Sequence, residues 1–265
     1  MKNVFKSIGH IKERCVYLKK KLLILGICIG VVFMIGAKMT KTAGANTIPD
    51  VIKPSVVLAY VPKGAVLYDN IDGNAVNLIY SGQRVEILKD RSGEWYFVKY
   101  KNKKGWVKRA ALEIPKEAPV NTSVLADKVI TDYANSNLLS DTEHFVWVDI
   151  DRQRIYVLKG ENGNRTIEKR IVCATGKNET PTVRGTFKTG DKGEWFYTER
   201  LKSGAKYWVR FDGSYLFHSV AMDKDKNITD NVLGEKRSSG CVRMSVEDAK
   251  WFYENIEEGT SVWIY

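Results

Sequence analysis

The residues best suited to chemistry surround Cys241, near the C-terminal end, in the run Arg-Ser-Ser-Gly-Cys-Val-Arg-Met-Ser. A cysteine becomes a strong nucleophile once its thiol loses a proton. A helix is expected to begin after Ser245, because Asp248 three residues later completes a capping box. The start of that helix and the Arg243 cation would both favour the thiolate. Gly240 permits a tight turn whose backbone N–H groups can bind an oxyanion.

A nucleophilic thiol needs a base, and the chain has three histidines. His218 follows two aromatic residues at the end of an expected strand, where a rigid scaffold presents side chains to a site. His144 opens another expected strand and is interpreted as an ordinary surface or edge histidine. His10 lies before an apolar run, on the other side of an expected membrane segment. His218 is therefore the candidate base for Cys241.

The elements that must position these residues are mostly β-strands. In residues 55–113, short apolar strands alternate with turn pairs such as Asp72-Gly73, which is typical of a small barrel or sandwich. Residues 114–142 carry Pro115 and Pro119 and read as a linker with one short amphipathic helix. Residues 143–265 read as a second β-rich domain with a short C-terminal helix. The strands are expected near 56–61, 65–68, 84–88, 94–100, 105–107, 145–150, 154–158, 167–174, 206–211, 214–218 and 261–265.

The N-terminus has the pattern of a membrane-orienting segment. Residues 1–21 hold seven Lys or Arg and one Glu, a net +6 of the total +11, and an apolar run without charge follows. This predicts a cytoplasmic basic segment over 1–21, a single-pass membrane anchor over 22–40, and a stalk over 41–54 that leads to domains on the outer, cell-wall side. A signal peptide cut after Ala45 is the alternative. The charge distribution gives no reason to expect a nucleic-acid partner.

The four cysteines do not form an obvious disulfide framework. Cys15 would be cytoplasmic and Cys28 would lie within the membrane, so only Cys173 and Cys241 share the outer compartment. Their pairing stays open on sequence grounds. Cys173 follows two branched apolar residues and is expected to be a buried small hydrophobic residue. Cys241 is expected to be a free thiol.

Three stretches resemble two known families. The order His218, loop, Ser-Ser-Gly-Cys241-Val-Arg-Met resembles the signature of the L,D-transpeptidase catalytic domain. The segment from Thr180 to Phe187 is similar to that family's upstream Thr-Pro-x-Gly-x-Phe stretch, and the resemblance extends over residues 143–265. The run from Gly93 to Leu112 resembles bacterial SH3-like domains, which commonly bind cell-wall peptides.

The transpeptidase resemblance implies a reaction. Cys241 attacks the carbonyl of the third residue of a peptidoglycan stem tetrapeptide, a diamino acid such as meso-diaminopimelate, and D-alanine leaves. The side-chain amine of another stem resolves the thioester and forms a 3–3 cross-link. His218 accepts and returns the proton, and the Ser239 carbonyl orients its ring. The N–H groups of Gly240 and Cys241 hold the oxyanion.

The same resemblance implies substrate contacts. Arg243 would bind a substrate carboxylate or support the turn. Apart from the resemblance, four aromatic residues of the expected hairpin are interpreted either as the lining of a substrate groove, with Tyr207 and Tyr215 as its candidate contacts, or as packing within the hairpin; they are Tyr207, Trp208, Tyr215 and Phe217. Two departures bear on these details: Ser239 stands where many members have His, and Ser219 stands where many have Gly. No metal cluster or phosphate-binding loop is evident in the sequence, so no cofactor is expected. The oligomeric state stays open.

Two other functions use the same residues. With water in place of the amine, the dyad would make the chain an L,D-carboxypeptidase, or a cysteine peptidase that acts on cell-wall peptides. A wall-binding module without catalysis is the third alternative, and the intact Cys241 and His218 argue against it.

Overall fold

The computed structural model of this protein describes residues 48–265. The expected basic segment, the anchor and the first part of the expected stalk lie outside these residues. Within 48–265, no helix combines the length and the apolar character needed to cross a membrane. The described chain is mostly β with a short C-terminal helix, which confirms that part of the predicted fold class.

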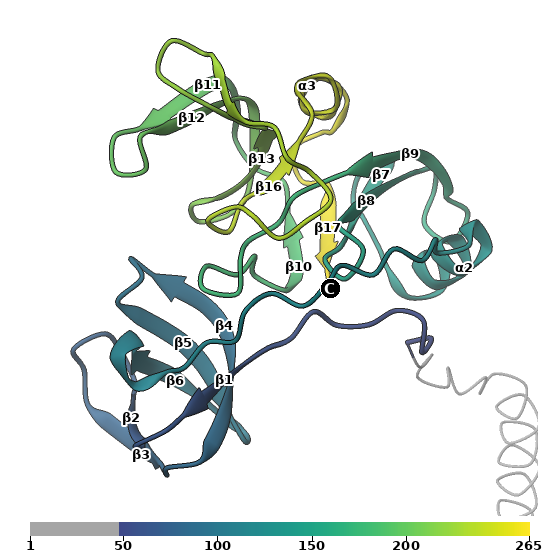
Figure 1. Ribbon diagram of the computed structural model, residues 1–265. Helices are drawn as coiled ribbons and strands as arrows, with labels where there is room; N and C mark the ends of the chain where they lie inside the picture. Colours follow the sequence, from purple (N-terminus) through teal and green to yellow (C-terminus); the bar gives the residue numbers. More distant parts are fainter. Residues whose placement is uncertain (1–47) are drawn as a thin grey trace, which may run out of the picture. The chain divides into compact units, whose positions relative to one another are not determined.

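The first domain, here called the β1–β6 domain, is an antiparallel sheet that curls around its own apolar core (Figure 1). The strand order is β1-β4-β5-β6-β2-β3. Alternate residues point inward, so that Ala59 and Val61 of the first strand are fully buried. Its resemblance to SH3-like domains stays a prediction. The elements are β1 (Val57–Val61), β2 (Ala65–Tyr68), β3 (Ala75–Ile79), β4 (Gln83–Arg91), β5 (Trp95–Tyr100), β6 (Lys103–Lys108) and the 3₁₀ turn η1 (Arg109–Ala111).

The C-terminal domain contains two sheets. One has the order β10-β17-β7-β8-β9, and the other has the order β15-β14-β12-β13-β16, with β11 paired to β12. Its helices are α2 (Asp127–Asn137) and α3 (Val246–Asn255). The strands are β7 (His144–Asp149), β8 (Arg154–Lys159), β9 (Thr166–Val172), β10 (Gly185–Lys188), β11 (Lys192–Thr198), β12 (Ser203–Asp212), β13 (Tyr215–Ser219), β14 (Ala221–Met222), β15 (Ile228–Asp230), β16 (Val242–Met244) and β17 (Ser261–Ile264).

The main core lies between these two sheets and α3. The first sheet contributes alternate residues such as Val146 and Val262, and the second contributes Phe217 and Val242, all four of them fully buried. Helix α3 closes one end of this core with Phe252. The helix begins as predicted: Ser245 Oγ accepts the N–H of Asp248 at 3.0 Å, and the Asp248 carboxylate accepts the Ser245 hydroxyl at 2.8 Å.

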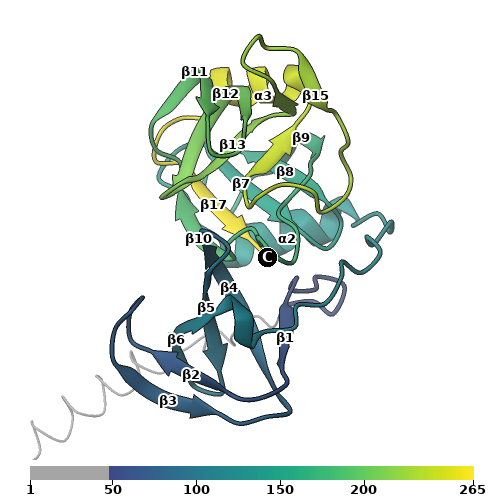
Figure 2. The same cartoon turned by 60° about the vertical axis from the view of Figure 1, so that its left-hand side comes forward.

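The opposite face of the first sheet is covered by α2 and by the chain before β1 (Figure 2). Ile130 and Ala134 of α2 are fully buried in one apolar cluster with Trp147, and Ile52 joins the same cluster with 4% of its surface exposed. The end of the expected stalk and the helix of the expected linker are therefore packed parts of the C-terminal domain. The sequence pattern did not reveal this because the apolar partners lie on distant strands.

Arg152 fastens these segments to the β7–β8 hairpin. Its guanidinium is 5% exposed, pairs with Asp149 at 3.1 Å, and donates to the carbonyls of Val51 at 2.8 Å and Ser123 at 3.1 Å. Removal of the Asp149 carboxylate would cost several kcal/mol of stability, because it would leave the buried Arg152 charge without its partner. The segments on both sides of the β1–β6 domain therefore meet at one side chain.

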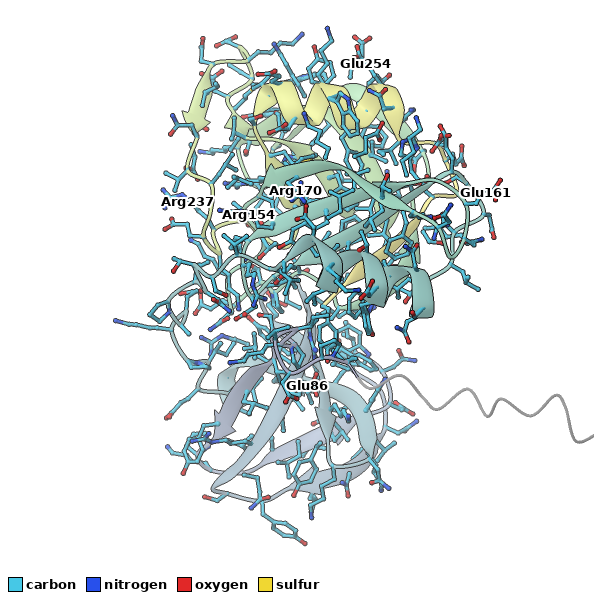
Figure 3. All side chains as sticks on the ribbon, turned by 90° about the vertical axis from the view of Figure 1, so that its right-hand side faces the viewer. Glu86, Arg154, Glu161, Arg170, Arg237 and Glu254 are labelled. Carbon is cyan, nitrogen blue, oxygen red and sulfur yellow. The ribbon has the colours of Figure 1, made fainter. Side chains whose placement is uncertain are left out.

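Named contacts join the β1–β6 domain to the C-terminal domain. The buried Tyr96 donates its hydroxyl to the Glu179 carbonyl at 2.7 Å, and Arg109 pairs with the Glu179 carboxylate at 3.2 Å. Glu86, labelled in Figure 3, forms an ion pair with Arg184. Both partners of that pair are largely buried, so that the contact is more specific than an exposed surface pair.

We expect Ile130→Ala to lower the free energy of unfolding by about 2–4 kcal/mol, because it empties a fully buried site on the α2 face. Val124→Ala, at a side chain that is 91% exposed, is the matched control and should change stability by less than about 0.5 kcal/mol. Chemical denaturation followed by circular dichroism measures both. If both variants lost the same small amount of unfolding free energy, α2 would not be an integral part of the fold.

Candidate active site

The candidate nucleophile and base are brought together by a parallel strand pair. Strand β13 pairs with β16 in the register Phe217↔Val242 and His218↔Arg243. Side chains of paired residues lie on the same face of a sheet, and successive residues alternate. Phe217 and Val242 therefore point into the core, whereas His218 and Arg243 point to the other face. Cys241, one residue before Val242, shares the face of His218.

That face opens into a cavity of about 440 Å³, here called the thiol cavity. Cys241 and His218 both line it, together with residues of the β11–β12 hairpin. The charged side chains that line it are all arginines, namely Arg200, Arg210 and Arg243. The thiol cavity thus combines a nucleophile, an imidazole and positive charge, which suits a substrate that carries carboxylates.

The turn that carries Cys241 is held by its own hydrogen bonds. Ser238, which is buried, donates its hydroxyl to the Cys241 carbonyl at 2.5 Å and accepts the Gly240 N–H at 3.1 Å. Gly240 has φ of +111°, and a Cβ there would lie 2.6 Å from the Tyr215 ring. Glycine is therefore required by both conformation and space.

These bonds correct the predicted oxyanion donors. The Gly240 N–H is already engaged by Ser238, so it does not face the cavity as a spare donor. The Cys241 N–H has no partner among residues 48–265 and remains as the donor beside the nucleophile. The sequence showed a Ser/Gly-rich turn, but it did not show which N–H the serine hydroxyl would take.

The segment before β10 clamps this turn from the other side. Thr182, which is buried, donates its hydroxyl to the Gly240 carbonyl at 2.7 Å and accepts the Gly176 N–H at 2.8 Å. Thr180 donates to the Ser238 carbonyl at 3.1 Å. The Thr-Pro-Thr stretch carried the sequence resemblance, but no role was assigned to its hydroxyls. Their role here is to position the thiol turn.

The imidazole of His218 is fixed by a carbonyl, but not by the predicted one. Its Nδ1 lies 2.6 Å from the carbonyl oxygen of Ser219, and Phe196 packs edge-on with ring centroids 5.4 Å apart. Since a carbonyl only accepts, Nδ1 carries the proton and Nε2 is left as the acceptor. The role predicted for the Ser239 carbonyl belongs to Ser219, because the contact is made within β13 itself.

Burial lowers the pKa of His218 to about 4, against the opposing effect of the Ser219 carbonyl and with a further lowering by the Arg243 charge. The ring is therefore neutral near pH 7. A neutral imidazole with a free Nε2 is the form that can accept a thiol proton.

The thiol is also neutral at rest. Burial raises the pKa of Cys241, although the Leu216 N–H and the charges of Arg243 and Arg210 oppose the rise. The predicted help from the helix start is absent because β16 intervenes between Cys241 and Ser245. Four extended residues span about 13 Å, and the helix dipole fades within about one turn. The thiol is instead 3.8 Å from the Ser214 carbonyl.

Arg243 has a structural partner as well as a place in the cavity. It pairs with Asp230 at 2.9 Å, and its side chain is 15% exposed. Its Nε is buried and has no hydrogen-bond partner among the described residues. A buried donor without a partner is costly, so this nitrogen is an exception among the buried polar atoms of the described chain.

Of the two predicted groove tyrosines, one faces away from the thiol cavity. Tyr207 has φ of +55°, but the β11–β12 register continues across it without a shift, from Trp195↔Lys206 to Gly193↔Trp208. Tyr207 packs on the core side, with its ring centroid 5.9 Å from that of Tyr253 of α3, whereas Trp208 lines the thiol cavity. Tyr215 lies beside the thiol turn, against Gly240.

The other singled-out residues lie apart from the site. Cys173 is fully buried and unpaired, as predicted, and Cys241 is also a free thiol. The interpretation of His144 as a surface or edge residue is wrong: it is 2% exposed, and its ring nitrogens contact Glu257 at 2.8 Å and Glu168 at 2.9 Å. Its strand lies between two others, which buries it.

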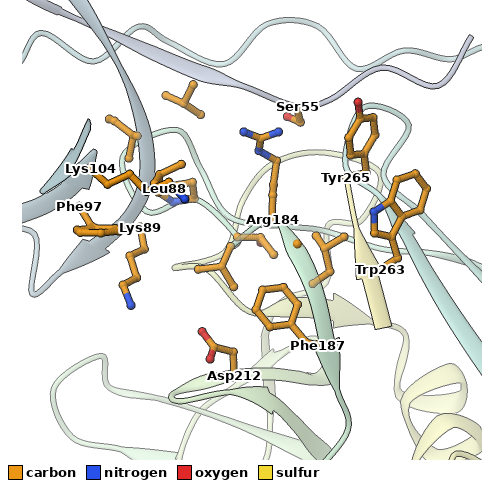
Figure 4. Close-up of a pocket in the computed structure, with 17 residues that line it drawn as sticks. Ser55, Leu88, Lys89, Phe97, Lys104, Arg184, Phe187, Asp212, Trp263 and Tyr265 are labelled. Atoms are coloured by element: carbon orange, nitrogen blue, oxygen red, sulfur yellow. The ribbon is translucent and has the colours of Figure 1, made fainter. Parts of the chain in front are cut away.

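A second cavity, of about 460 Å³, lies between β4 and β5 on one side and β10 and β17 on the other (Figure 4). Lys89 and Asp212 line it from the two domains, and Phe187 and Trp263 supply apolar walls. Neither Cys241 nor His218 lines this cavity. The candidate nucleophile and base therefore do not face this cavity.

Comparison with known proteins gives a family match within the C-terminal domain. The model of the YkuD family, the L,D-transpeptidase catalytic domain, matches residues 143–264. YciB of Bacillus subtilis (strain 168), named as a candidate L,D-transpeptidase, is 40% identical over 128 residues, which cover 44% of this chain and 64% of YciB. This chain thus spans less than two thirds of that relative.

Solved structures give partial matches. A Clostridium acetobutylicum ATCC 824 protein, described as a fused Zn-dependent amidase/peptidase/peptidoglycan-binding domain-containing protein, is 32% identical, with 55% of this chain and 66% of that chain covered and a TM-score of 0.45. An L,D-transpeptidase from Mycobacterium smegmatis is 16% identical, with 68% and 82% covered and a TM-score of 0.39.

We expect Thr182→Val to lower the free energy of unfolding by about 2 kcal/mol, because it leaves the Gly176 N–H and the Gly240 carbonyl buried without their partner. Thr166→Val, at an exposed position of β9, is the isosteric control and should be nearly neutral. Denaturant titration compares the two. If Thr182→Val is as stable as the control, the threonine does not hold the thiol turn.

Proposed function

We propose that this chain cross-links peptidoglycan stem peptides through a thioester on Cys241, and the match of residues 143–264 to the model of the L,D-transpeptidase catalytic domain supports this. The observation that carries the proposal is the placement of Cys241 and a neutral His218 on one sheet face, lining one cavity. The cationic lining of the thiol cavity fits a stem peptide, which carries several carboxylates.

In the first half-reaction, the Cys241 sulfur attacks the carbonyl of the third stem residue, and His218 Nε2 takes the thiol proton. The Cys241 N–H stabilises the resulting oxyanion. When the intermediate collapses, the carbon–nitrogen bond to D-alanine breaks and His218 gives its proton to the leaving amine. The products are a thioester, free D-alanine and a neutral imidazole.

In the second half-reaction, the side-chain amine of another stem attacks the thioester carbonyl. His218 takes a proton from the attacking amine, the carbon–sulfur bond breaks, and the proton returns to the sulfur. The result is a 3–3 cross-link and the starting enzyme. If water attacks instead, the same steps yield a tripeptide, so that the carboxypeptidase alternative differs only in the acceptor.

The resting state supports a proton transfer that is coupled to attack. Burial holds Cys241 as a thiol and His218 as a neutral ring, so that a thiolate–imidazolium pair is not formed before the substrate arrives. The Ser219 carbonyl stabilises the imidazolium once it appears, in the way an orienting acceptor does in other nucleophile–base pairs.

We predict that the purified full-length chain converts disaccharide-tetrapeptide into 3–3 dimers with release of D-alanine. Cys241→Ala should reduce this by more than about 10³-fold, because it removes the nucleophile. Cys173→Ala, at the other described cysteine, is the control and should keep the activity. Mass spectrometry of the products decides: tripeptide alone favours the carboxypeptidase, and turnover by Cys241→Ala contradicts the mechanism.

The pH dependence of acylation follows from the neutral His218. The ring accepts a proton only while it is unprotonated. We use a carbapenem as a reagent that acylates Cys241, and we predict that the rate of this acylation declines as the pH falls through about 4, rather than through 6.5. Adduct formation against pH, followed by mass spectrometry, measures this.

The folding state must be monitored in the same experiment. As the pH falls from 6.5 to 4, the unfolded chain binds a proton at His218 that the folded chain does not bind. The free energy of unfolding therefore decreases as the pH falls through that range. Circular dichroism at each pH separates the two effects. An acid limb near 6.5 in a fully folded sample would contradict the assignment of a low pKa.

A further inference from the structure

A third cavity, of about 520 Å³, adjoins the thiol cavity. Arg200, Ser214 and Ser239 line both cavities, so the two are continuous around the turn that precedes Cys241. Its other wall comes from the β1–β6 domain, through the end of β4 and through Trp106 of β6. We call it the mixed-charge cavity, because cations and carboxylates both line it.

The carboxylates of this combined groove are all on one side. Among the described residues that line the thiol cavity there is no Asp or Glu, whereas Asp90 and Asp212 line the mixed-charge cavity. Lys89, Arg91 and Arg200 line the same space. Within residues 48–265, none of these five charged groups forms an ion pair. They are therefore available to a ligand that carries both signs of charge.

Asp90 lies close to the chemistry despite its place in the other domain. The pKa of Tyr215 is raised first by burial and then by the negative charges of Asp90, Cys241 and Asp212. Tyr215 itself packs against Gly240 of the thiol turn. Burial raises the pKa of Asp90, and the backbone N–H groups of Gly93 and Asp90 and then the Arg200 charge offset part of that rise. Asp90, Arg200 and Tyr215 thus line one cavity beside the thiol turn.

The proposed reaction needs two substrates of different charge at one sulfur. The acyl donor presents carboxylates and fits the arginines of the thiol cavity. The acceptor presents an ammonium beside a carboxylate, at the end of a diamino acid side chain. Three arginines would repel that ammonium from the thiol cavity. The approach that offers it a counter-charge runs through the mixed-charge cavity.

We propose that the β1–β6 domain supplies one wall of the acceptor site, with Asp90 binding the incoming side-chain ammonium and Arg91 or Arg200 binding its carboxylate. This inference rests on the proposed transpeptidase function. It makes the β1–β6 domain a determinant of acceptor specificity, in addition to its packing role. The amine loses its counter-charge as it moves past Ser239 toward the arginines, which favours its neutral, nucleophilic form.

The kinetic test uses the full-length chain, a saturating tetrapeptide donor, and a labelled stem tripeptide that ends in meso-diaminopimelate as acceptor. Asp90→Asn should raise the KM for the tripeptide about tenfold, because it removes a charged partner of the ammonium. Single-turnover release of D-alanine should stay within about twofold. Glu113→Gln removes an exposed acid elsewhere in the same domain and should change neither quantity.

Two kinetic outcomes overturn the proposal. One is an unchanged KM for the tripeptide in a folded Asp90→Asn variant. The other is an equal slowing of D-alanine release and of cross-linking, which would place the effect of Asp90 on the donor. A raised KM for the tripeptide with unchanged release of D-alanine supports the site, since a general loss of structure would affect both quantities.

A binding test separates this site from the proposed activity. By calorimetry, full-length Cys241→Ala should bind the tripeptide about tenfold more tightly than the same tripeptide with an acetylated side-chain amine. The preference should disappear when Asp90→Asn is added. Equal binding of the two peptides overturns the site without relying on any further variant.

The combined results distinguish the two proposals. An Asp90-dependent preference in a protein that makes no dimers would leave the acceptor site standing and refute the transpeptidase function. Dimer formation without any preference for the free amine would support the transpeptidase function and refute the acceptor site.

Discussion

The site depends on one structural constraint, the parallel pairing of β13 with β16. Its register puts Phe217 and Val242 into the core and leaves His218, Arg243 and Cys241 on the opposite face. A slip of one residue in β16 would turn Val242 toward the cavity and Arg243 into an apolar core, at a cost of several kcal/mol. Core packing therefore enforces the arrangement of the candidate catalytic groups.

Much of the fold was predictable because its signals are local. The hairpins at Asp151–Gln153 and Asp212-Gly213, the capping box at Ser245 and the final strand all follow from neighbouring residues, and each is found in the structure. Strand β3 was not predicted, since most of its side chains are exposed and lack an alternating apolar pattern. The packing of Ile52 on the C-terminal domain was not predicted either, because its partners are distant in sequence.

Some features of the site were also predictable from local sequence, and others were not. Cys241 and His218 were identified from their types and order, without any distance. The carbonyl that orients the ring and the N–H group left free for an oxyanion both depend on backbone geometry. Tyr207 follows simple alternation along β12, which places it with Val209 and Phe211 on the core side and Trp208 on the side of the thiol cavity.

The chain reaches the C-terminal domain twice, first at Ile52 and again at Leu125, and both residues join one apolar cluster. The β1–β6 domain is thus a loop of about seventy residues whose two ends must meet. Closing so long a flexible loop costs more entropy than closing the short tethers around a domain that is already folded, by about 1 kcal/mol. A β1–β6 domain that is already folded therefore brings the ends of its own loop together and lowers the entropy cost of joining Ile52 and Leu125 in the cluster of the C-terminal domain.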